Sequence, residues 1–147
     1  MSAPGHVPRY TIYDSQGALA VDLERLRRVV GAALPLCLER SATGGGVLRE
    51  IAELEVSLVD DETIARLHGE FLGDPTPTDV ITFDHGEIVV STETAIARAG
   101  EFGNTPDREL ALYIVHGLLH LAGYLDKSQA EFERMRDLQE EVLAAVW

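Results

Sequence analysis

Residues 110–122 read LALYIVHGLLHLA, a stretch in which only His116, Gly117 and His120 interrupt apolar side chains. A helix that is apolar nearly all round is buried, because no face of it gains from contact with water. This stretch therefore predicts a helix at the centre of the fold. The two histidines are four residues apart, so they share one face and lie one turn from each other.

The limits of this central helix are marked in the flanking sequence. Thr105-Pro106-Asp107 supplies a capping hydroxyl, a proline at the first helical position and an acid in the first turn, which together are typical of a helix start. The helix should run to about Ala122. Gly123 is placed to end it in a left-handed turn.

The remaining elements follow from hydrophobic spacing and capping residues. A glycine-rich loop at 41–46 separates elements rather than domains. The predicted elements are a strand near 10–13, a helix over 19–40 that Pro35 kinks or ends, a strand over 53–58, a helix capped by Asp60 that runs to about 70, a hairpin of strands 78–83 and 87–91, a helix capped by Thr92, the central helix, and a last helix with the capping box Ser128 and Glu131. This order predicts an α+β fold, in which a small mixed sheet is packed with helices.

Length and composition restrict the class of protein. A chain of 147 residues fits a single domain over 1–147. No apolar run is long enough to cross a bilayer and the first residues show no secretory pattern, so we expect cytoplasmic residence. The one cysteine, Cys37, lies in an apolar helical stretch and is expected in the core.

The net charge of −13 and the pI near 4.6 argue against nucleic-acid binding on bulk electrostatics, because that binding relies on Lys and Arg. Any RNA role must come from a local patch. Arg25, Arg27 and Arg28 form the densest basic cluster, but Asp22 and Glu24 interleave with them, which favours a solvated helix face.

The histidine pair indicates a metal site. Histidines at i and i+4 can both reach one ion, and Asp126, beyond the turn at Gly123, can return to it as an oxygen ligand. Three protein ligands leave a fourth position for water, which is the arrangement of a catalytic zinc. The pair alone is also compatible with hydrogen-bonded core histidines; Gly123 and Asp126 at these offsets favour the metal.

The spacing is similar to the extended zincin pattern H-E-x-x-H-x-x-G-x-x-H, with two differences. Gly117 replaces the catalytic glutamate of a metallopeptidase, and Asp126 replaces the third histidine. The first difference argues against a peptidase, because no base is positioned to activate water.

Four blocks of the chain resemble the YbeY family. Residues 116–124, HGLLHLAGY, resemble the first nine positions of its signature H-G-x-L-H-L-x-G-Y-D-H. Residues 77–83 (PTDVITF), 86–91 (GEIVVS) and 108–111 (RELA) resemble its P-T-D-V-L-S-F, G-D-I-V-I-S and R-E-L-A blocks, in the same order.

The resemblance implies a metal-dependent endoribonuclease with a YbeY-like, zincin-like fold. Such an enzyme acts on single-stranded RNA, in maturation of small-subunit ribosomal RNA and in ribosome quality control. The implied ligands of one Zn²⁺ are His116, His120 and Asp126. Thr78 and Asp79 either line the cleft beside the ion, orient a ligand histidine or cap a turn, and Arg108 is either a phosphate contact or a solvated surface group.

Two positions depart from the family pattern. The final D-H reads Leu125-Asp126, which changes the third ligand from nitrogen to carboxylate and makes the metal a weaker Lewis acid. Phe71-Leu72-Gly73 stands where the family carries Y-R-G, so an arginine thought to contact phosphate is missing.

Two other functions remain open from the sequence. One is a ribosome-associated binding factor, without catalysis, that contacts the small ribosomal subunit and whose metal site is structural or vestigial. The other is a hydrolase of small molecules or peptides. The native metal, the RNA position cut and the oligomeric state do not follow from the sequence.

Overall fold

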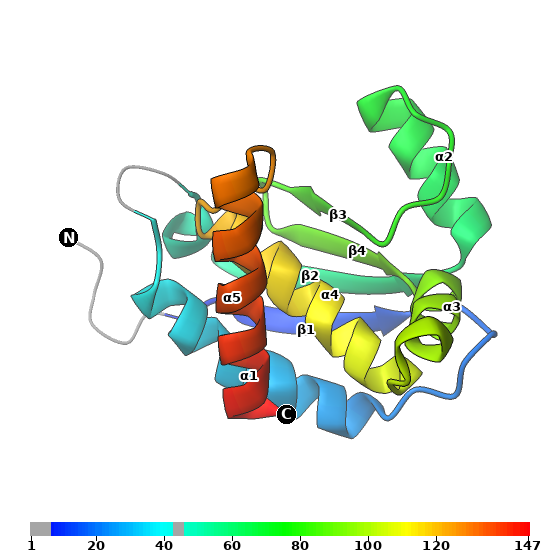
Figure 1. The fold of residues 1–147 in the computed structure, drawn as a ribbon, viewed down its shortest axis with the longest axis horizontal. Coiled ribbons are helices and arrows are strands. Elements are labelled where there is room, and N and C mark those ends of the chain that lie inside the picture. Colours follow the sequence, from blue (N-terminus) through cyan, green and yellow to red (C-terminus); the bar gives the residue numbers. More distant parts are fainter. Residues whose placement is uncertain (1–6, 43–45) are drawn as a thin grey trace.

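The fold is a four-stranded sheet with five helices, seen in a computed structural model that describes residues 7–42 and 46–147 (Figure 1). The strands are β1 (Arg9–Asp14), β2 (Glu53–Val59), β3 (Val80–Phe83) and β4 (Glu87–Ser91), and the helices are α1 (Leu23–Glu39), α2 (Asp61–Leu72), α3 (Thr92–Phe102), α4 (Pro106–Leu121) and α5 (Gln129–Val146). A short 3-10 turn (Leu48–Glu50) precedes β2. The predicted order of elements and the α+β class are confirmed.

The sheet is mixed, with the strand order β1-β2-β4-β3. β1, β2 and β4 run parallel, and β3 pairs antiparallel with β4, which follows it, as the predicted hairpin. β2 and β4 are therefore the central strands, and their apolar side chains alternate between the two faces of the sheet.

The two faces of the sheet bury different helices. Val56, Leu58, Ile88 and Val90 belong to the main core, which α1, α4 and α5 complete. Val59, Ile81 and Val89 point to the other face and pack against Ile64 of α2. α4 lies on the main-core face of the sheet and also contacts α1 and α5, so its apolar composition is required (Figure 1). α1 packs on the same face beside β1, where the Tyr10 hydroxyl donates to the Arg27 carbonyl.

Two predicted helix starts differ from the structure, and one of the two alternatives for Pro35 is excluded. The first helix begins at Leu23 rather than at 19, because the Asp22 side chain caps it and the Gln16 side chain binds the backbone N–H groups of Ala18 and Leu19 in a turn. Pro35 does not end that helix, which runs on to Glu39. Ser91, not Thr92, caps α3: its hydroxyl accepts from the Thr94 N–H at 3.1 Å.

The glycine-rich loop meets the end of α4. The Ala42 and Val47 N–H groups donate to the carbonyls of Ala122 and Leu121, at 2.9 and 2.7 Å. These contacts satisfy carbonyls that the end of a helix leaves without partners. Residues 43–45 of the predicted loop lie outside the described residues.

Candidate metal centre

Gly117 lets the central helix approach the sheet closely. A Cβ atom at this position would lie 2.9 Å from Cγ2 of Ile88 and 3.2 Å from Cγ2 of Thr82. The position that carries a glutamate in metallopeptidases therefore faces a packed β-sheet in this chain. A glutamate would not fit there, which removes the structural basis for the peptidase alternative.

The chain reverses immediately after α4 and brings Asp126 back to the histidines. Gly123 adopts a φ of 104°, the left-handed conformation predicted for it. The Tyr124 N–H donates to the Leu119 carbonyl at 3.0 Å, and the Tyr124 hydroxyl donates to the carbonyl of Arg40. The turn is thus fixed on both sides.

The three predicted ligands converge. Nε2 of His116 and Nε2 of His120 each lie 3.4 Å from the same oxygen of Asp126, Oδ2. These contacts are longer than charge-assisted hydrogen bonds, which measure about 2.7–2.9 Å. Ligand atoms about 2.1 Å from a tetrahedral zinc stand about 3.4 Å apart, so the separations fit such an ion.

The hydrogen bonds of the two imidazoles direct their lone pairs to this point. Nδ1 of His116 lies 2.8 Å from Oε1 of Gln139, and Nδ1 of His120 lies 2.8 Å from the carbonyl oxygen of Tyr124. Both partners are acceptors, so each Nδ1 carries the proton and each neutral ring has its lone pair on Nε2. Fixed tautomers of this kind are what a metal site requires.

Burial keeps His120 neutral. It lowers the pKa of His120 below the ordinary value, and the neighbouring His116 lowers this pKa further, against the opposing effect of Asp126. A neutral imidazole is the form that binds metal. Two nitrogen lone pairs and a carboxylate therefore face one another and repel. A divalent cation bound between them would replace this repulsion with attraction.

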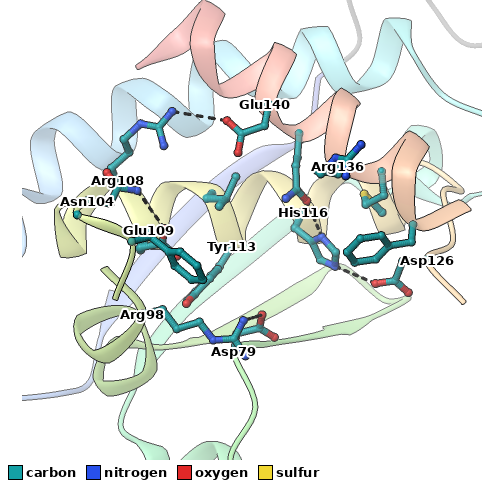
Figure 2. A pocket seen from close by; sticks show the side chains of 16 residues that line it. Asp79, Arg98, Asn104, Arg108, Glu109, Tyr113, His116, Asp126, Arg136 and Glu140 are labelled. Atoms are coloured by element: carbon teal, nitrogen blue, oxygen red, sulfur yellow. Dashed lines mark hydrogen bonds and ion pairs between the residues drawn. The ribbon is translucent and has the colours of Figure 1, made fainter. Parts of the chain in front are cut away.

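The candidate metal centre opens onto a cleft of about 690 Å³ (Figure 2). His116 and Asp126 line this cleft, together with residues of α3, α4 and α5. Three arginines also line it: Arg98, Arg108 and Arg136. A ligand bound in the cleft would reach the open side of the three-residue cluster.

The candidate substrate-binding residues lie in different places. Arg108 lines the cleft, with its Nη2 3.7 Å from Oε2 of Glu140. Asp79 also lines it; its Oδ1 accepts from the Val80 N–H at 2.8 Å and its Oδ2 lies 3.9 Å from Nη1 of Arg98. Thr78 is not among the lining residues, and its hydroxyl lies 3.4 Å from Oδ1 of Asp79. The interpretation that Thr78 or Asp79 orients a ligand histidine is wrong, since Gln139 and Tyr124 do so.

The basic cluster on α1 lies elsewhere. The guanidinium of Arg25 lies 3.6 Å from the ring centre of Trp147 and donates to the Trp147 carbonyl at 2.9 Å. Arg28 pairs with Glu24 at 3.6 Å. Neither residue lines the cleft. Arg27 and Arg28 are exposed, as predicted for a solvated helix face, whereas Arg25 is half-buried against Trp147.

Sequence reasoning missed two polar residues of α4 in the cleft. Glu109 and Tyr113 line it, and with His116 and His120 they form a stripe spaced by four, three and four residues along the helix. Such spacing places side chains on one face. The sequence contained this signal, because these four residues recur at helical spacing along an otherwise largely apolar helix.

The fold and the site define a class: α+β proteins that hold a candidate metal centre on a buried helix with a histidine pair and a third ligand beyond the helix end. Comparison with known proteins identifies the family within this class. The family model "Endoribonuclease YbeY" matches residues 11–146. The chain belongs to the YbeY family of endoribonucleases.

Individual relatives agree with this assignment. The chain is 38% identical to the Endoribonuclease YbeY of Moorella thermoacetica over 74% of this chain and 81% of that protein. It is 35% identical to the one from Pelotomaculum thermopropionicum, over 87% and 90% of the two chains. The solution structure of TM1509 from Thermotoga maritima matches with a TM-score of 0.57 and 29% identity, over 92% of this chain and 91% of that one.

A helix that spans a membrane must be both long and apolar. Of the helices in the part of the chain that the structure describes, none is both long and apolar enough to span a bilayer.

Proposed function

We propose that this protein is a zinc-dependent endoribonuclease that cleaves single-stranded RNA in the maturation of small-subunit ribosomal RNA, in the cytoplasm. Membership of the YbeY family supports the nuclease activity and favours it over a binding factor without catalysis. The observation that carries the proposal is the convergence of His116, His120 and Asp126 beside a cleft, with one Asp126 oxygen 3.4 Å from a nitrogen of each imidazole.

The residues present fit a zinc ion, with two imidazole nitrogens and one carboxylate oxygen as ligands. When bound, the ion supplies a Lewis acid that stabilises negative charge developing on the scissile phosphate. Gln139 and the Tyr124 carbonyl hold the two imidazoles in position. Loss of either hydrogen bond would leave both histidines in the chain but would let their rings move out of position.

The arginines of the cleft provide a local positive surface for RNA, although the chain as a whole has a net charge of −13. Leu72, in place of the family's arginine, is 63% exposed and is not among the lining residues. Arg98, Arg108 and Arg136 take over the phosphate contacts in this proposal. The cleft also carries four carboxylates, from Asp79, Glu109, Asp126 and Glu140, so its positive charges exceed the negative ones only when a divalent ion is bound. RNA binding should therefore depend on the metal.

The test combines metal analysis with RNA cleavage. Protein purified without added metal should contain about one zinc per chain, and His116→Ala and His120→Ala should remove both the zinc and the cleavage of single-stranded RNA. His85→Ala is the matched control, because His85 is an exposed hairpin residue and should leave both unchanged. Full cleavage by metal-free His120→Ala protein would rule out the mechanism.

A further inference from the structure

The end of the cleft that lies along α4 from the metal ligands contains two buried polar side chains with unused hydrogen-bonding capacity. Glu109 is only 6% exposed, and its Oε1 accepts from the Asn104 amide at 3.0 Å. Tyr113 is 4% exposed, and its hydroxyl makes no hydrogen bond of ordinary geometry with any described residue. Burial and the nearby Glu109 carboxylate raise the pKa of Tyr113, so the hydroxyl stays protonated and can donate. Both line the cleft, and Figure 2 shows the Tyr113 hydroxyl directed toward Arg98 and Asp79.

Buried polar groups in native proteins are almost always hydrogen-bonded, so these two need an explanation. A phenylalanine at position 113 would fill the same volume without leaving a hydroxyl unpaired. A tyrosine hydroxyl that finds no partner within the fold, and that lines a cleft, is accounted for when a ligand supplies the partner.

The hydrogen-bond donors and acceptors at this end of the cleft indicate which chemical groups that ligand carries. The Glu109 carboxylate accepts hydrogen bonds, whereas the Tyr113 hydroxyl and the Arg98 guanidinium donate them. Phe102 is 73% exposed at the same part of the cleft and offers an apolar ring. A planar group with adjacent N–H donors and a nearby carbonyl acceptor would satisfy all of these residues.

We propose that Glu109, Tyr113 and Arg98 form a guanine-binding subsite. Guanine presents N1–H and its exocyclic amine to a carboxylate and O6 to a hydroxyl or guanidinium, and its ring can stack on Phe102. Adenine offers an acceptor at N1, and uracil flanks its single N–H with two carbonyls, so neither base matches. Cytosine matches only through its amine. The proposal rests on the proposed function, since it assigns the base that the nuclease reads.

The subsite lies close enough to the metal centre to influence the cleavage position. Glu109 and His116 are separated by two helical turns, a rise of about 10 Å, which corresponds to about three stacked nucleotides. The preferred guanine should therefore lie within a few nucleotides of the scissile bond. A preference located far from that bond would not be explained by this subsite.

Binding of free nucleosides tests the subsite without relying on cleavage. In ¹⁵N-labelled protein without added metal, guanosine should shift the amide resonances of residues 104, 109 and 113. It should bind at least fivefold more tightly than adenosine or inosine, because inosine lacks the exocyclic amine and one hydrogen bond is worth roughly that factor. Equal affinities, or shifts confined to residues around His116 and His120, overturn the proposal.

Two variants separate recognition from folding. Tyr113→Phe should weaken guanosine binding by roughly fivefold, with a midpoint of thermal unfolding that is equal to or above the parent value. Glu109→Gln should abolish discrimination between guanosine and inosine, whereas Glu140→Gln, which removes the same charge from the cleft, should retain it. Retained discrimination in a folded Glu109→Gln protein overturns the proposal.

Cleavage of a random single-stranded RNA pool by the zinc-loaded protein distinguishes the subsite from the proposed function. Cleavage sites that share a guanine at a fixed offset from the scissile bond support both the subsite and the nuclease function, provided that Tyr113→Phe loses this guanine preference. Guanosine binding without any cleavage supports the subsite and contradicts the nuclease. Cleavage without a guanine preference contradicts the subsite and leaves the nuclease standing.

Discussion

Nδ1 of His116 lies 2.8 Å from Oε1 of Gln139, so a side chain of α5 fixes the orientation of a candidate metal ligand carried by α4. Replacement of this acceptor should weaken metal binding while leaving all three ligands in place. For Gln139→Leu we expect a loss of about 10- to 100-fold in zinc affinity, measured by competition with a chelator. Gln129→Leu, on the first turn of α5 and paired with Glu133, is the control. Equal affinities of the two variants would show that the hydrogen bond does not hold the site together.

Gly117 should be intolerant of even a methyl group. The added Cβ would meet Ile88 at 2.9 Å inside a packed core, and overpacking of this kind costs about 1–3 kcal/mol, against a gain of about 0.5–1 kcal/mol for alanine over glycine in a helix. Gly117→Ala should therefore lower the free energy of unfolding in urea. Gly100→Ala, on α3 with no atom within 4 Å of its Cβ, should raise it. A stabilised Gly117→Ala protein would refute the close-packing interpretation.

Cys37 should be inert in the folded protein and should make stability sensitive to alkaline pH. Burial raises the pKa of its thiol from 9.0 to about 12, so the reactive thiolate is absent at neutral pH. The unfolded chain loses this proton first, and the free energy of unfolding should decline as pH rises from about 9 toward 12. A disulfide reagent at pH 8 should label the protein only after denaturation; rapid labelling of the native protein would place Cys37 outside the core.

Local sequence signals predicted the elements because capping and periodicity act over a few residues. Ser128 and Glu131 form the predicted capping box, and Thr105 caps α4 as predicted. Ser91 and Thr92 are adjacent hydroxyl residues and either can cap a helix, so the sequence did not distinguish them. In the structure the Thr92 hydroxyl donates instead to the carbonyl of Val59, at the end of β2.

Long-range partners could not be predicted in this way. The parallel pairing of β1 with β2 joins residues far apart in sequence, and Gln139 reaches His116 from a helix whose polar positions otherwise resemble a solvated surface. The cluster of His116, His120 and Asp126 was predictable because all three lie within eleven residues, on a helix and the turn after it. The expectation of a single domain over residues 1–147 stays a prediction.

Arg108 tests whether the cleft binds the RNA backbone. Its guanidinium lies 3.7 Å from Glu140, a long and partly exposed ion pair that a phosphate can replace. If Arg108 contacts one phosphate, Arg108→Gln should weaken binding of an uncleaved single-stranded oligonucleotide to the zinc-loaded protein. It should also reduce the slope of log K against log salt concentration by about 0.7. Arg9→Gln is the control, because Arg9 pairs with Glu53 on the exposed side of β1 and is not among the residues that line the cleft. An unchanged slope in Arg108→Gln, with zinc content equal to that of the parent, would mean that the phosphates lie elsewhere and that Arg108 serves only its partner on α5.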